Sequence, residues 1–182
     1  MLQFRIQSTP NPNARKYIVS EDLKSEGRVS YTSPEECAHV PLAKELMEID
    51  GVSQTHFFEN VLTVTQTGAL DWGQLDQVVQ EIVQEHYGQH DTGFIDSLEK
   101  PKEKKQLPPE LQKIDEILDL TIRPSLQMDG GDVEVLDMED NILTIRYQGA
   151  CGGCPSSMTG TLEAIRMILR DEVRDDMEVV AI

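Results

Sequence analysis

The chain has 182 residues, of which 38% are hydrophobic and 5% aromatic, so it can form one ordinary domain or two small ones with modest cores. Its 33 acidic and 16 basic residues give a net charge of −17, which would repel phosphate backbones and anionic lipid headgroups. We therefore expect neither nucleic acid nor a membrane surface as a partner. No stretch approaches the ~20 apolar residues of a membrane helix. The start of the chain has no signal or transit character, which predicts a cytoplasmic protein.

The first segment, residues 1–90, is predicted to be a compact α+β domain with the element order ββαββα. Short apolar runs rich in β-branched and aromatic residues predict its strands, and apolar residues spaced by three and four predict its helices. The expected elements are strands at 2–7 and 17–19, a helix from Pro41 to about Gly51, a hairpin of strands at 52–58 and 61–67, and a helix from Leu75 to Tyr87.

A charged, proline-containing linker is predicted at residues 91–109, because its lysines and prolines leave almost nothing apolar to bury. Residues 110–182 then predict a second small domain of order αββαβ, in which two helices cover one face of a three-stranded sheet. The fold class is thus α+β, with two small α/β-sandwich-like domains. The elements expected in the second domain are a helix over 111–122 with a break or kink at Arg123-Pro124, strands at 133–137 and 142–147, a helix over 158–173 and a strand at 179–182.

Two cysteines, Cys151 and Cys154, lie three residues apart between a predicted strand and a predicted helix. The whole chain has three cysteines, an odd number that suits reduced thiols better than a disulfide framework. Gly152 and Gly153 between them let the backbone approach a bulky inorganic core, which favours an iron-sulfur cluster over a bare zinc ion. Pro155 suits the first helical turn, whose free amides favour the thiolate form that binds metal.

The spacing alone leaves three chemistries open. The pair could be a redox dithiol of a thiol-disulfide oxidoreductase, a zinc clamp or an iron-sulfur site. A tetrahedral zinc ion or a cubane cluster wants four thiolates, and one chain offers this one pair. The shortage of ligands therefore predicts a homodimer that forms on metal or cluster binding.

Residues 128–133 and 149–157, with Thr161-Leu162, strongly resemble the Nfu domain of NifU-like proteins over about residues 110–182. The resemblance implies a maturation factor that is not an enzyme. Such a factor receives a cluster from scaffold proteins, usually a [4Fe-4S] cubane shared by two subunits with [2Fe-2S] as the alternative, and passes it to apo-proteins. Cys151 and Cys154 are then the ligands.

The first segment resembles the Nfu N-terminal domain, through Thr9 to Ala14 and through Pro41-Leu42-Ala43 leading to Ile49-Asp50-Gly51-Val52. This resemblance implies that residues 1–90 help to recognise partners or clients. Together the two resemblances cover nearly the whole chain.

The other candidate residues are interpreted as structural. Cys37 is interpreted as an inert small residue, and Gly130-Gly131 as a turn between a helix and a strand. The histidines share no ligand spacing and are interpreted as surface or packing residues, and the acidic residues near the glycine pair as solvated surface. These residues are His39, His56, His86 and His90, and Asp129, Asp132 and Glu134.

Overall fold

The computed structural model describes residues 2–95, 108–152 and 155–182, with the backbone alone over 155–159. The chain forms two compact units, Met1–Pro101 and Lys102–Ile182. The predicted linker lies largely outside the described residues. The division into domains at residues 90 and 110 therefore stays a prediction.

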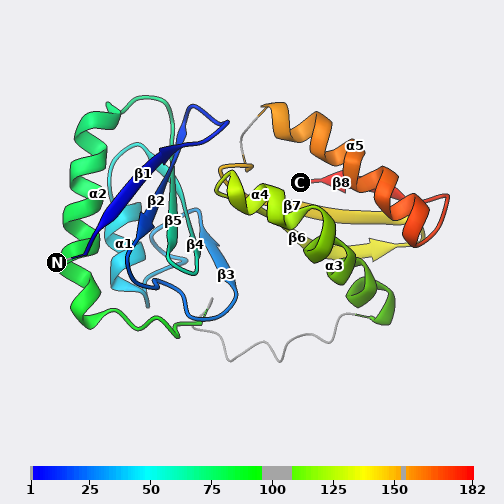
Figure 1. Ribbon diagram of the computed structural model, residues 1–182, viewed down its shortest axis with the longest axis horizontal. Helices are drawn as coiled ribbons and strands as arrows, with labels where there is room; N and C mark the ends of the chain where they lie inside the picture. Colours follow the sequence, from blue (N-terminus) through cyan, green and yellow to red (C-terminus); the bar gives the residue numbers. More distant parts are fainter. Residues whose placement is uncertain (1, 96–107, 153–154) are drawn as a thin grey trace. The chain divides into compact units, whose positions relative to one another are not determined.

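The first unit contains a five-stranded antiparallel sheet (Figure 1). The strand order is β1-β2-β5-β4-β3, which leaves β1 and β3 as the two edges. The strands are β1 (Phe4–Ser8), β2 (Ala14–Val19), β3 (Arg28–Tyr31), β4 (Val52–Phe58) and β5 (Val61–Gln66).

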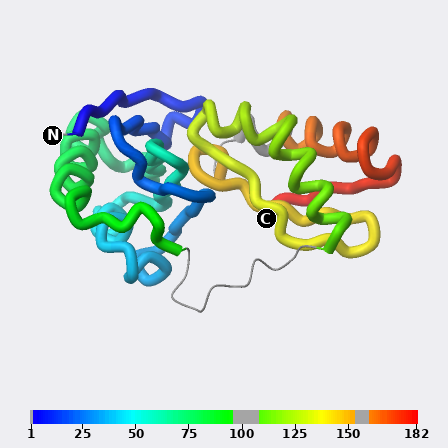
Figure 2. The backbone as a smooth tube through the Cα atoms, turned by 60° about the horizontal axis from the view of Figure 1, so that its bottom comes forward, coloured from blue at the N-terminus to red at the C-terminus, as the bar shows by residue number. Residues whose placement is uncertain are grey.

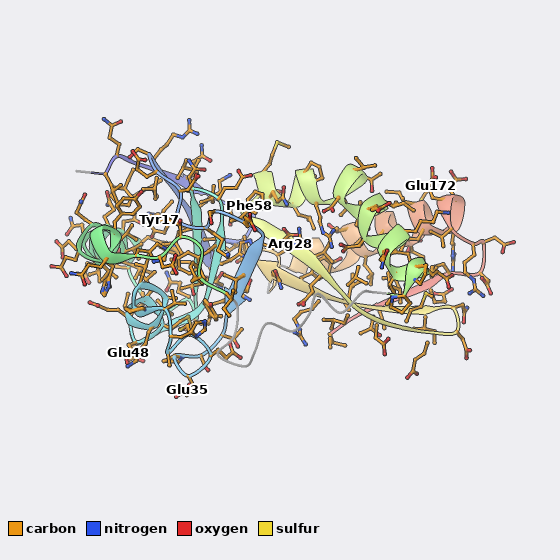
Figure 3. The ribbon with its side chains drawn as sticks, turned by 90° about the horizontal axis from the view of Figure 1, so that it is seen from below. Tyr17, Arg28, Glu35, Glu48, Phe58 and Glu172 are labelled. Atoms are coloured by element: carbon orange, nitrogen blue, oxygen red, sulfur yellow. The ribbon has the colours of Figure 1, made fainter. Side chains whose placement is uncertain are left out.

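Two helices, α1 (Pro41–Met47) and α2 (Trp72–His86), cover one face of this sheet, followed by the short 3-10 helix η1 (Tyr87–Gln89). The covered face carries a row of paired residues that runs from Ile6 through Tyr17 and Leu62 to Phe57. Alternate residues of a strand point to opposite faces of the sheet, so these residues point toward the helices and contribute to the core between sheet and helices. Tyr17, labelled in Figure 3, donates its hydroxyl to Asp76 Oδ1 of α2 at 2.8 Å.

The predicted order ββαββα missed one strand, because β3 lies in a polar stretch. Its four residues present Val29 and Tyr31 to the core, and Val29 pairs with Phe57. A four-residue edge strand with two apolar residues gives too short an alternation to be distinguished from a loop.

The second unit contains a three-stranded sheet of order β6-β7-β8, formed by β6 (Gly131–Glu139), β7 (Ile142–Gly149) and β8 (Glu178–Ala181). β6 and β7 form the predicted hairpin, with a two-residue turn at Asp140-Asn141 in which Asp140 has a φ of 53°. β8 runs parallel to β7, so the chain must cross over between them.

The crossover is α5 (Pro155–Glu172), which lies beside α3 (Pro109–Thr121) and α4 (Arg123–Met128) on one face of the sheet (Figure 2). The predicted break at Arg123-Pro124 is confirmed, because α3 ends and α4 begins there. The core of this unit joins inward residues of the three helices to the paired strand residues Val135, Ile145 and Tyr147. The predicted α+β class is confirmed, and the helices of the second unit cover one face of its three-stranded sheet as predicted.

Candidate functional site

Cys151 lies in the turn that leads from β7 to α5. Gly149 ends β7 with a φ of 60°, a conformation that glycine adopts without strain. The turn is held by backbone hydrogen bonds: the Ala150 N–H donates to the Gly130 carbonyl at 3.0 Å, and the Gly152 N–H donates to the Gly149 carbonyl at 3.1 Å. The first of these bonds ties the turn to the residue just before β6.

The backbone of Gly131 lies close to the Cys151 thiol. Gly131 pairs with Gly149 in the sheet, and a Cβ placed on it would lie 2.3 Å from Cys151 Sγ and 2.9 Å from the Cys151 backbone nitrogen. Any side chain at this position would therefore displace the cysteine. Gly130, with a φ of 80°, makes the predicted turn, but the close approach at Gly131 was not foreseen from the sequence.

The Cys151 side chain belongs to the core of the second unit and is 2% exposed, whereas Gly152 is exposed. Tyr147 interacts electrostatically with Cys151. Burial, followed by the charge of Cys151, raises the pKa of Tyr147 to about 12. The Tyr147 hydroxyl is buried and has no hydrogen-bond partner among the described residues.

A buried arginine fixes the start of β6. Arg123 is 1% exposed, and its Nε donates to the Val133 carbonyl at 3.1 Å. Its Nη1 donates to the Asp119 carboxylate at 2.7 Å, and its Nη2 to the Asp115 carboxylate. Burial opposes the charged form, but these carboxylates outweigh it and raise the pKa of Arg123.

Asp132 completes this network, and its interpretation as solvated surface is wrong. Its carboxylate is fully buried and lies 3.4 Å from Arg123 Nε. It also accepts the Val133 N–H at 2.6 Å and the Gln127 side-chain amide at 3.2 Å. Helices α3 and α4 are thus connected through polar bonds to the strand that begins under Cys151. Asp115 and Asp119, at eight and four residues before Arg123, were the sequence signal for this network.

The second predicted ligand, Cys154, lies outside the described residues, so its role stays a prediction. Cys37 is in the first unit, buried in that unit's core, with its thiol 3.4 Å from the Ser33 carbonyl. Burial raises the pKa of Cys37 to about 11. This environment suits the inert role that we predicted for it.

Three of the histidines line one pocket of about 380 Å³ in the first unit. Each holds Nε2 close to a protein oxygen: His39 to the Ile95 carbonyl at 2.7 Å, His86 to Glu45 at 2.5 Å and His90 to the Leu23 carbonyl at 2.7 Å. Within the described parts of both units, no three side chains of histidine, cysteine, aspartate or glutamate are arranged to hold a metal ion.

With this geometry in view, the comparisons define the class of protein. A family model described as NifU-like domain matches residues 114–180, and one described as scaffold protein Nfu/NifU N terminal matches residues 4–90. Over 178 residues the chain is 31% identical to NifU-like protein 5, mitochondrial, of Arabidopsis thaliana, a match that covers 94% of this chain and 65% of the relative.

The chain is also 30% identical over 169 residues to the Homo sapiens protein named NFU1 iron-sulfur cluster scaffold homolog, mitochondrial, covering 92% of this chain and 66% of the relative. It thus spans just under two thirds of the length of these relatives. A solution structure of a NifU-like protein from Saccharomyces cerevisiae aligns with 18% identity and a TM-score of 0.45, over 55% of this chain and 87% of that one. The chain belongs to the Nfu/NifU-like family.

The predicted cytoplasmic location is contradicted by these comparisons. Two Arabidopsis thaliana relatives and the human relative are named mitochondrial, which points to the mitochondrion rather than the cytoplasm. The character of the first residues was not a sound basis for assigning a compartment. Among the described helices, none has the combination of length and hydrophobicity that crossing a bilayer requires.

Proposed function

We propose that this protein is an iron-sulfur cluster scaffold and carrier rather than an enzyme. Two copies hold one [4Fe-4S] cluster through Cys151 and Cys154 of each chain and pass it to apo-proteins during their maturation. The observation that carries the proposal is the position of Cys151, held over Gly131 at the junction of β7 and α5. The names of the relatives support the scaffold role.

The described residues fit a cluster as cargo. A soft thiolate donor is the ligand that iron-sulfur clusters take. The missing side chain at Gly131 leaves the backbone close to the Cys151 sulfur. The proposed roles of the units follow: residues 110–182 bind the cluster, residues 1–90 recognise partners and residues 91–109 link them.

The number of ligands requires a second copy. Cys37 lies buried in the core of the other unit, so the second unit supplies two thiolates at most, Cys151 and Cys154. Four thiolates from two chains complete a cubane. Delivery then proceeds by exchange, in which a client thiolate forms an iron-sulfur bond as the bond to one carrier cysteine breaks, and the released thiolate takes up a proton.

This exchange needs a local movement. Cys151 is 2% exposed, so a cluster shared with a second copy can bond to its sulfur, and a client can reach that iron, only when the turn at residues 149–152 opens. The hydrogen bond from Ala150 to the Gly130 carbonyl has to break for this opening. The backbone at Gly131 stays in place, because the Arg123 network anchors it.

Anaerobic reconstitution of the full chain with iron and sulfide tests the proposal. About four irons per two chains, with broad visible absorption, are expected, together with a shift from monomer to dimer in sedimentation. Cys151→Ser and Cys154→Ser should each abolish the cluster and the dimer, while the matched variant Cys37→Ala should load normally. Chains that take up no iron, that dimerise on zinc alone, or that reduce disulfides with Cys151 and Cys154 would overturn the proposal.

A further inference from the structure

The outer edge of the first unit's sheet offers unused hydrogen-bonding groups. β1 pairs with β2 on one side, and within residues 2–95 the sheet has no strand on the other. The Ser20 N–H donates to the Gln3 carbonyl, which makes Gln3, Arg5 and Gln7 the residues bonded to β2. By alternation, the N–H and C=O groups of Phe4 and Ile6 face the open edge.

One residue of α2, Gln84, already makes a hydrogen bond to β1's side of the sheet of the kind that a further strand would make. The outward N–H of Leu2 donates to the Oε1 of Gln84 on α2 at 2.9 Å. A side-chain oxygen thus occupies the place that a carbonyl of an added strand would take. Beyond Leu2, the structure gives no such substitute on this side of Phe4 and Ile6 in the described first unit.

A groove of about 430 Å³ lies between this edge and α2. The half-buried side chains of Leu2 and Phe4 make its strand side, and these residues pack against the core. Its helix side carries two exposed carboxylates. The residues that line it are Leu2, Phe4, Gln80, Glu81, Gln84 and Glu85.

We propose that β1 and this groove bind an extended segment of a partner protein, which adds to the sheet as a sixth strand next to β1. Alternate side chains of an added strand point to the same face, so every second residue of the segment would enter the groove. The apolar strand side selects an apolar residue, and Glu81 and Glu85 select a basic residue two positions away. The inference deepens the recognition role proposed for residues 1–90.

The acidic charge of the chain favours a basic partner over a second copy. Two copies joined through β1 would bring the Glu81 and Glu85 of each into one interface, where like charges repel. Arg5, the one cation on β1, is exposed on the opposite side of the strand from Phe4, so it does not offset them. A segment that carries lysine or arginine meets no such penalty.

The test uses the full chain, no cluster and an eight-residue capped peptide with the repeat Thr-Leu-Thr-Lys. Binding is followed by NMR, together with amide hydrogen exchange. We expect exchange to slow at Phe4 and Ile6 on binding, while Arg5 and Gln7, already paired with β2, serve as internal references. A peptide methylated on alternate backbone nitrogens should not bind, since it cannot complete the strand.

Charge reversal supplies the second comparison. Glu81→Lys/Glu85→Lys should weaken binding of the lysine peptide roughly three- to tenfold, as two exposed ion pairs allow. The control Glu26→Lys/Asp50→Lys makes the same change of charge at exposed residues away from the groove and should leave binding unchanged.

Equal binding of the methylated peptide, equal loss in both charge variants, or self-association that protects Phe4 and Ile6 without peptide would overturn the proposal. So would no binding at about 1 mM peptide, the range of weak recognition. Because no cluster is present, such a failure would leave the cluster proposal standing, and failed reconstitution would leave this one standing.

Discussion

Replacing Arg123 by methionine tests whether the buried network holds the second unit together. Arg123 is 1% exposed and Asp132 is fully buried, so removing the cation leaves a carboxylate in the core without its partner. Breaking a buried ion pair in this way costs about 3–5 kcal/mol of folding free energy. The pairs with Asp115 and Asp119 add little, because those carboxylates are 34% and 54% exposed and solvent screens them.

The assay is urea unfolding of the full chain followed by circular dichroism and by tryptophan fluorescence. The protein has one tryptophan, Trp72, in the first unit, so its fluorescence transition should stay unchanged while the circular-dichroism transition of the second unit moves to lower urea. Arg146→Met is the matched control. This arginine is 52% exposed and 3.7 Å from Glu134, so its loss should cost less than about 1 kcal/mol.

A double-mutant cycle separates the pair from general damage. Asp132→Asn keeps the volume and an acceptor for the Val133 N–H, so Arg123→Met/Asp132→Asn should be less destabilised than the sum of the single variants by about 1–3 kcal/mol. The reasoning is refuted if Arg123→Met costs no more than Arg146→Met, or if the two changes simply add.

Three further predictions concern single positions. Gly131→Ala should reduce the iron bound on reconstitution to the level of Cys151→Ser with unchanged secondary structure, because its Cβ would collide with Sγ; full loading would contradict this. Gly160→Ala, where a Cβ meets only open space within α5, should stabilise the second unit by about 0.5–1 kcal/mol in urea unfolding, and any destabilisation would contradict it. Burial raises the pKa of Cys37 from 9.0 to about 11, so its contribution to stability is complete below pH 9 and is lost as the pH rises to 11. The Trp72 urea midpoint should therefore fall across this range in the wild type and less in Cys37→Ala, and equal slopes would refute the assignment.

Periodicity predicted the elements whose apolar residues repeat over several turns or strand pairs. The apolar stripe from Leu75 to Tyr87 predicted α2, although its Val78 is 39% exposed, and the break at Arg123-Pro124 was placed where α3 gives way to α4. β3 failed because a pattern of two apolar residues in four carries too little information. Its partner strand, β4, supplies the pairing that makes it a strand.

The site was predicted less completely than the fold, because spacing along the chain does not show burial. Cys151 was identified from its spacing of three residues from Cys154 in the sequence. Its closeness to Gly131, 20 positions away, follows instead from the sheet register. Asp132 was misinterpreted for the same reason. An aspartate in an acidic chain is typical of the surface, and the charge of Arg123 with the donors of Val133 and Gln127 makes its burial stable.

The arrangement around Cys151 divides the site into a fixed half and a half that has to move. Residues 130–133 are the fixed half, because the sheet pairing of β6 and the buried Arg123 network hold their backbone in place. Gly131 has no side chain, which lets this backbone lie close to Cys151 Sγ. The turn at residues 149–152 is joined to this backbone by the Gly131–Gly149 sheet pair and by the bond from Ala150 to the Gly130 carbonyl. Under the proposed function, a chain that both retains and releases a cluster needs one half that stays in place and one half that opens. A loop held as firmly as β6 would keep its thiolates from a client, whereas a loose backbone at residues 130–133 would leave them without a defined geometry for binding.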